Sequence, residues 1–545
     1  MTEHTKTDGL PDSLPDSLPD SLSDSPPVMA PVDATTLLDN LRSPNERVAA
    51  GKVECNACPV LCQISPGRAG ACDRYANAGG VLVRVDPVVL LRKALAVGDA
   101  ALVPFTARVP GEAAIAPLWP SITEDLFVTG IGSSTTYPDY KPAPFIVAST
   151  SNGVDMVTVV TEGIFSYCSL KLKIDTDRWL GQEQASVRCQ GEVVGHVSTA
   201  EYGSQMLSLG GVHHLTGGSK REGRITVEAM QTLGNCGAVD LQIDGGARVK
   251  VQAGQPPVVD GVPEVRMRLG CGSATIGIFA RQFAGLADEV VVVDDHITGV
   301  LTEHQAGRCL GLRGSGLKVR GRKSTPGRYF QVAKPGTGWG GTDIADPLSI
   351  LEPWDAALGW PGQRLLMVST TGEHADWFVL DSGLQPQPEP MPPEVQAIVQ
   401  RIGDNCEPAL CSVLFLAGAG GSLRAGVSDN PVLLTRAIQC GQVRVTCGGA
   451  PTYVWPGGGI TLMVDVLRMP AGSFGTVPTP AIVAPIEFTL SAADYSALGG
   501  YSGYVRPLAQ VLAQGGWHAD GAPTARRWIS AAPGNPWPLA PVEQR

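Results

Sequence analysis

Four cysteines placed close together constrain this chain more than any other feature of its sequence. Cys55, Cys58, Cys62 and Cys72 fall within eighteen residues, and two, three and nine residues separate them in turn. Such short loops let consecutive sulfurs converge on one compact centre, and the iron of a cluster needs thiolate ligands on all sides. The spacing therefore predicts an iron–sulfur cluster, with [4Fe-4S] as the favoured type.

A structural zinc ion is the main alternative for four cysteines. Zinc sites of this kind use paired Cys-x2-Cys knuckles, and the second pair is absent here. Gly67 and Gly70 lie between the ligands, where a backbone that wraps a cluster must turn tightly. The Cys-x3-Cys-x2-Cys motif of radical enzymes is also absent. We therefore expect a cluster that relays electrons, and we expect the nine other cysteines to be free thiols.

The length and composition predict a turn-rich enzyme with several domains. A chain of 545 residues exceeds the size of a single hydrophobic core. Charged residues make up only 17%, and 66 Gly and 44 Pro imply many turns. We expect an α+β or α/β fold with the following parts: a disordered tail over 1–48, an iron–sulfur module over 49–97, a central α+β domain over 98–383 and a C-terminal α/β domain over 394–545.

Two segments motivate these boundaries. Residues 11–25 repeat the unit Pro-Asp-Ser-Leu and then decay, and such a segment buries too little surface to offset its ordering entropy. The Pro-rich stretch Leu384–Pro393 is the predicted linker. Periodicity predicts helices over 276–286, 300–310 and 393–402, a strand over 412–417, and a strand buried on both faces over 289–296.

Charge and hydropathy exclude several classes of protein. The net charge is -11, and residues 1–50 contribute nine acidic against three basic residues. No long basic run is present, so we expect no nucleic-acid partner. The sequence shows neither a secretory signal nor an apolar span of the roughly 20 residues that a membrane helix needs. These features predict a cytoplasmic protein without a membrane partner, and they leave a homo-oligomer open.

A group of titratable side chains marks the middle of the chain as a candidate catalytic site. Asp294, Asp295 and His296 follow a run of four valines, and Glu303 and His304 come within about two helical turns. The carboxyl end of a buried strand is where α/β sheets place ligands, so these groups could donate protons. The structural alternative is that the Asp pair caps the next helix and both His residues are satisfied.

A second polar group is a candidate for binding an anionic substrate. His213 and His214 precede Arg221 and Arg224 in a Gly-rich stretch, and arginine can grip a carboxylate with two hydrogen bonds. A surface hairpin explains the same residues equally well. Gly272–Thr275 bears a faint resemblance to Ser-Gly-Ala-Thr motifs that accept a phosphoester-linked flavin.

Several motifs resemble those of bacterial 6-hydroxynicotinate reductases. The cysteine segments 55–62 and 70–77 carry this resemblance, as does the run Val83-Arg-Val-Asp-Pro87. It continues in the segments Asp294–Gly299, Gly448–Pro451, Pro456–Ile460 and Val477–Pro480. The resemblance spans about residues 52–490.

The resemblance implies a ferredoxin-dependent reduction of 6-hydroxynicotinate to 1,4,5,6-tetrahydro-6-oxonicotinate in nicotinate degradation. Reduced ferredoxin, or a similar low-potential donor, would be the partner, and a small heteroaromatic carboxylate would be the substrate. A single cluster does not store two electrons at usual potentials, so we expect either a flavin (FAD or FMN) or two sequential ferredoxin encounters. Two alternatives stay open: an iron–sulfur lyase or hydratase, and an electron-transfer subunit without its own substrate.

Overall fold

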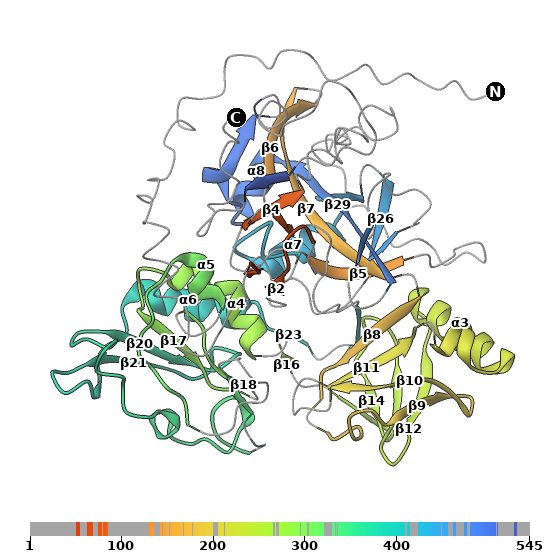
Figure 1. Cartoon of the computed structure of the whole chain (residues 1–545), viewed down its shortest axis with the longest axis horizontal. Helices are drawn as coiled ribbons and strands as arrows, with labels where there is room; N and C mark the ends of the chain where they lie inside the picture. The colour runs from red at the N-terminus through yellow and green to blue at the C-terminus, as the bar shows by residue number, and fades with distance from the viewer. Residues whose placement is uncertain are drawn as a thin grey trace.

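A computed structural model of the whole chain contains both helices and strands, so the fold is α+β (Figure 1). The predicted tail over 1–48 lies outside the residues that the structure describes. The described residues are 51–54, 63–68, 75–78, 80–85, 130–135, 142–143, 145–151, 153–166, 168–176, 178–199, 205–211, 213–264, 267–268, 272–294, 296–301, 305–320, 330–332, 334, 336–408, 411–414, 423–447, 450–455, 461–464, 474–476, 480–507, 510 and 528–530.

The first large sheet is antiparallel and comes almost entirely from residues 169–263. Its nine described strands run in the order β15-β14-β13-β12-β9-β10-β11-β8-β24. Helix α3 (Lys220–Gly234) packs Ile225, Ala229 and Leu233 onto one face of it. The strands are β8 (Ser169–Ile174), β9 (Ser186–Cys189), β10 (Glu192–Thr199), β11 (Gln205–Gly210), β12 (Val239–Ile243), β13 (Arg248–Val251), β14 (Val258–Val259), β15 (Val262–Pro263) and β24 (Cys411–Leu414).

The second sheet closes on itself. Strands β7, β5, β27, β26, β25 and β29 pair in this order, and β29 pairs back with β7, so the described strands form a closed antiparallel ring. Helix α7 (Pro431–Gln439) packs on its core, and α8 (Ala492–Ala497) follows β29. The strands of this sheet are β5 (Gly130–Thr135), β6 (Phe145–Ser151), β7 (Val154–Ser166), β25 (Arg444–Cys447), β26 (Ala450–Trp455), β27 (Thr461–Val464), β28 (Phe474–Thr476), β29 (Pro480–Ser491) and β30 (Val505–Pro507).

The third sheet contains the valine run, and helices cover it. The four residues of β17 (Glu289–Val292) and the following Val293 are all buried, with Val290 and Val292 in one core and Val291 and Val293 in another. This confirms the prediction of a strand buried on both faces. The sheet contains β17 (Glu289–Val292), β18 (His296–Gly299), β19 (Phe330–Val332), β20 (Arg364–Val368), β21 (Ala375–Leu380) and β22 (Pro386–Pro388), with helices α4 (Gly272–Phe283), α5 (Gln305–Leu310) and α6 (Pro393–Asp404).

The predicted helices over 276–286 and 393–402 match α4 and α6 to within four residues, whereas the helix predicted over 300–310 begins only at Gln305 as α5. The stretch predicted to be a linker contains β22, which pairs with β21 at the edge of the sheet. An edge strand tolerates proline because its outer side needs no ladder hydrogen bonds. Helix α6 then packs into the same core as α4 and β17.

Short strands surround the cysteine segment. Strands β1 (Val53–Glu54) and β2 (Gln63–Ile64) pair with each other, whereas β3 (Tyr75–Ala78) and β4 (Val81–Val85) form a sheet with β31 (Trp528–Ser530). Strand β16 (Met267–Arg268) pairs with β23 (Glu407–Pro408). Within the described ranges, no helix combines the length and apolar character needed to cross a membrane.

Candidate functional site

The residues that flank the cysteines form a pinned hairpin. Cys55, Cys58, Cys62 and Cys72 themselves lie outside the described residues. Glu54 and Gln63 are direct partners in the β1–β2 ladder, so the two ends of segment 55–62 are held together. Paired residues of an antiparallel ladder lie about 4.5–5.5 Å apart between Cα atoms. This closure suits a compact centre with several ligands from one short segment.

Asn77 fastens the next strand to this hairpin. Its buried side-chain Nδ2 donates to the carbonyl oxygens of Gly51, at 2.7 Å, and Ile64, at 3.0 Å. Its main-chain N–H donates to the carbonyl of Arg68, and its own carbonyl accepts from Gly67. Because Cys72 is only five residues before Asn77, it lies within about 17 Å of this anchor. All four thiols are thus tethered to one small structure.

Asp294 lies at the carboxyl ends of two neighbouring parallel strands. Val292 of β17 pairs with Val368 of β20, and Asp294 and Thr370 each follow two residues later. The Thr370 hydroxyl donates to the Asp294 carboxylate, which is 4% exposed. Gly340 packs so closely that a Cβ there would lie 2.6 Å from the Val293 carbonyl oxygen, and its φ of 59° also favours glycine.

A pair of aromatic rings borders this strand-end site. The indole of Trp339, beside Gly340, stacks on the imidazole of His374 with ring centroids 5.3 Å apart. Trp339 is buried, whereas the His374 side chain is 48% exposed. Of the other predicted proton donors, His296 is the first residue of β18, and its side chain is not among the described parts of the structure. Asp295, Glu303 and His304 lie outside the described residues.

The predicted anion-binding residues lie at the start of a surface helix. His213 and His214 form part of a π-helical turn (His213–Gly217), and Ser219 caps α3 by accepting from Glu222 N–H. The His214 Nδ1 atom lies 3.5 Å from the Glu222 carboxylate. A helix start therefore replaces the alternative of a hairpin, because the Ser219 cap begins regular hydrogen bonding.

Both arginines of this group already face carboxylates. The Arg221 guanidinium lies 3.1 Å from Glu192, and the Arg224 guanidinium lies 2.8 Å from Glu228. The two arginine side chains are 65% and 61% exposed. Exposed ion pairs of this kind are weak, so a ligand can compete for these guanidinium groups at low cost.

A polar row crosses the sheet next to this helix. Lys171 on β8 pairs with Ser208 on β11, which pairs with His196 on β10, so the three side chains share the face opposite the apolar core. Burial lowers the pKa of Lys171. Burial also lowers the pKa of His196, and electrostatic interactions with His214 and Lys171 lower it further. Among the described residues, no carboxylate forms an ion pair with Lys171, whereas Lys173 lies 2.7 Å from Asp175. The row can therefore bind an anion.

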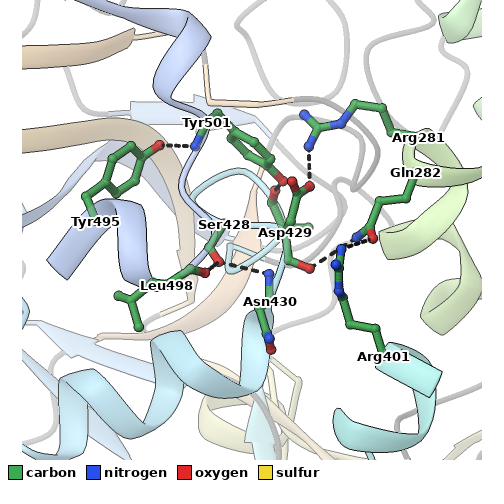
Figure 2. A network of polar contacts seen from close by, with 10 residues as sticks. Arg281, Gln282, Arg401, Ser428, Asp429, Asn430, Tyr495, Leu498 and Tyr501 are labelled. Carbon is green, nitrogen blue, oxygen red and sulfur yellow. Dashed lines mark hydrogen bonds and ion pairs between the residues drawn. The ribbon is translucent and has the colours of Figure 1, made fainter. Parts of the chain in front are cut away.

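A network of polar contacts joins α4 and α6 to the segment that precedes α7 (Figure 2). Arg281 donates to the Asp429 carboxylate, and its guanidinium lies 3.9 Å from the centroid of the Tyr501 ring. Gln282 donates to the main-chain oxygen of Asp429 at 3.1 Å and accepts from Arg401. The network therefore connects the helices of the third sheet to the unit built on the closed sheet.

Two tyrosines complete this network on the side of α8. The Tyr495 hydroxyl accepts from the Tyr501 N–H at 2.9 Å (Figure 2). The Tyr501 hydroxyl donates to the Ala425 carbonyl at 2.5 Å. Burial raises the pKa of both tyrosines, so both stay neutral hydrogen-bonding groups at physiological pH. We interpret the two tyrosines as structural groups that help to connect α4 and α6 to the unit of the closed sheet.

The chain is similar to a protein of known name. A protein of Eubacterium barkeri named 6-hydroxynicotinate reductase is 38% identical over 466 residues, which cover 86% of this chain and 88% of that protein. The chain belongs to the 6-hydroxynicotinate reductase family. No family model matches the chain. No solved structure matches it either.

This family member brings together residues that sequence patterns did not single out. Thr370 and His374 at the strand-end site were missed, as were Lys171 and His196 on the sheet. The alternation in Ser169–Ile174 does place its two lysines on one polar face, so this signal was available. The other contacts join residues far apart in the sequence and leave no local pattern. The Asp294–Gly299 motif begins two residues after β17 and includes all of β18.

Proposed function

We propose that this protein reduces 6-hydroxynicotinate to 1,4,5,6-tetrahydro-6-oxonicotinate in nicotinate degradation. The observation that carries the proposal is the 38% identity to a protein of that name over most of both chains. The reaction adds two electrons and two protons to an aromatic pyridone. We propose reduced ferredoxin, or a similar low-potential carrier, as the source of the electrons.

We further propose that Cys55, Cys58, Cys62 and Cys72 hold a [4Fe-4S] cluster in a small module over 49–97, preceded by a disordered tail. The pinned hairpin supports this, because Asn77 and the β1–β2 pair tie the cysteine segments to one point. A cluster supplies electrons one at a time at low potential. The part of the chain that the structure describes contains no other group of three or more potential metal-binding side chains.

Asp294 is the proposed proton donor that the structure describes best. Replacing Asp294 by Asn is expected to lower kcat about 100-fold or more, because a positioned acid contributes about that much to proton transfer. Steady-state kinetics with a chemical electron donor measure the change. The Thr370→Val variant keeps the carboxyl and is expected to lose much less. If Asp294→Asn lowers the melting temperature alone and leaves kcat intact, Asp294 has only a structural role.

The roles of the other candidates stay predictions. Asp295, His296, Glu303 and His304 remain candidate proton donors. The candidate ligands of the substrate carboxylate remain His213, His214, Arg221 and Arg224. The structure adds Lys171 and His196 to the candidate ligands of the carboxylate. Both are less exposed than the two arginines, and His196 interacts electrostatically with His214. We propose that the row of Lys171, Ser208 and His196 binds the substrate carboxylate. Lys171 is half-buried and has no described counter-ion, so a bound anion stabilises its charge more than it would stabilise an exposed arginine that is already paired.

Replacing Lys171 by Met is expected to raise KM for the carboxylate substrate about tenfold or more, with kcat little changed. A hydrogen bond to a charged group contributes about 1.5–3 kcal/mol, which gives a change of this size. Lys250→Met is the matched control, since Lys250 is an exposed lysine on β13 of the same sheet. An equal effect in both variants would refute a specific role for Lys171.

One anaerobic experiment tests the function itself. Purified and reconstituted protein is incubated with 6-hydroxynicotinate and with reduced ferredoxin or reduced viologen, and loss of the substrate is followed. Consumption matched to electron uptake supports the reductase. Cluster reduction without turnover would indicate an electron-transfer subunit, and a change of substrate without electron uptake would indicate a lyase or hydratase. An optical spectrum of the same sample tests the prediction of FAD or FMN.

A further inference from the structure

The cysteine segment differs in charge from the rest of the chain. Residues 49–97 contain six Lys or Arg against three Asp or Glu, a net charge of +3. The whole chain has a net charge of -11, so the residues outside 49–97 sum to -14, of which -6 comes from residues 1–50. A positive region on an acidic protein attracts acidic partners and directs their approach. The same segment of the sequence contains the four cysteines of the proposed cluster.

Two cations of this segment are exposed on the pinned hairpin. Lys52 immediately precedes β1, three residues before Cys55, and Arg68 lies four residues before Cys72. The two ends of the hairpin approach each other here, because a Cβ on Gly51 would lie 3.2 Å from Pro66. Among the described residues, neither Lys52 nor Arg68 forms an ion pair with a carboxylate. Both charges are therefore available to a partner.

Hydrogen bonds hold the backbone near these two cations together. Arg68 N–H donates to Ser65, its carbonyl accepts from Asn77, and Asn77 in turn donates to Gly51 beside Lys52. A docking surface that is already ordered loses less conformational entropy when a complex forms. The remaining exposed residues described on this hairpin, Gly51, Gln63, Pro66 and Gly67, are uncharged.

We propose that the face of the hairpin that bears Lys52 and Arg68 is the docking surface for a small acidic electron-carrier protein. The proposal rests on the proposed function, because it needs a cluster on the cysteines that lie close to these residues in the sequence. Complementary charge would hold the carrier over the cysteine segment, where an electron has the shortest path to the cluster. The alternative is that both cations only offset the negative charge that a thiolate-bound cluster carries.

Charge reversal separates these two roles. In the anaerobically reconstituted full-length protein, the double variant Lys52→Glu with Arg68→Glu is expected to raise KM for an acidic ferredoxin about tenfold or more at low salt. The wild-type KM should rise with ionic strength, and that dependence should shrink in the variant. Turnover with reduced methyl viologen, which needs no docking surface, should stay within about twofold. Lys250→Glu on the distant β13 strand should match the wild type in both assays.

Three results would overturn the proposal. One is a ferredoxin KM that the double variant leaves unchanged. Another is a loss of viologen turnover, or a shifted cluster potential, without a selective effect on ferredoxin, which would assign the cations to the cluster. If the wild-type protein does not reduce 6-hydroxynicotinate, the proposed function fails, and docking is then measured by calorimetric titration of ferredoxin into both proteins. Equal binding by wild type and double variant in that titration would also refute the docking surface.

Discussion

Replacing Cys58 by Ser is expected to abolish the iron–sulfur cluster and to lower reductase activity on the order of 100-fold or more. A serine hydroxyl is a poor ligand for cluster iron, and the segment offers only four thiols within reach of one another. The segment 55–62 contains no cysteine besides the three proposed ligands, so it cannot supply a replacement sulfur. Iron and acid-labile sulfide content, with the optical spectrum, measure the loss directly.

The control for this experiment is Cys440→Ser. Cys440 is an exposed free thiol at the end of α7, so its loss should leave both iron content and activity at the wild-type level. The cluster proposal fails if the Cys58 variant keeps its iron and sulfide. It also fails if anaerobically prepared wild-type protein is colourless and contains zinc, because zinc cannot pass electrons to the substrate.

Replacing Asp429 by Ala is expected to lower the free energy of unfolding by about 2–3 kcal/mol. The Arg281 side chain is 21% exposed and loses its carboxylate partner, and breaking a buried ion pair costs about 3–5 kcal/mol. The partial exposure of both side chains reduces that figure. The stacking of Arg281 on the Tyr501 ring remains in the variant and still stabilises the guanidinium, which makes the decrease in unfolding free energy smaller. Denaturant unfolding of the apoprotein measures the change.

Glu228→Ala is the matched control for Asp429→Ala. Glu228 pairs with Arg224 on the surface of α3, where an ion pair of this spacing contributes about 0.3–0.5 kcal/mol. Hydrogen exchange should also quicken at the end of α4 in the Asp429 variant, since the contact between α4 and the closed-sheet unit is weakened. Equal unfolding energies for the two variants would show that the network in Figure 2 does not join these units.

Part of the fold could be predicted from local sequence patterns. The run Val290–Val293 indicated a strand with both faces covered, and the structure places its alternate residues in two different cores. The segments around α4 and α6 were predicted as helices because apolar residues recur at helical spacing and Pro393 suits a first turn. The edge strand β22 was missed, because proline in the sequence indicated a linker more strongly than a strand.

The sequence by itself determined the clustering of four thiols, the family and the elements whose apolar spacing is regular, because these depend on residues close together in the chain. Only the tertiary structure decided which polar groups meet. Thr370 and Asp294 are 76 residues apart, and Arg281 and Asp429 are 148 apart. Such pairs form when sheets and helices bury their apolar faces against one another, and that packing depends on the whole chain and leaves no trace at either residue alone.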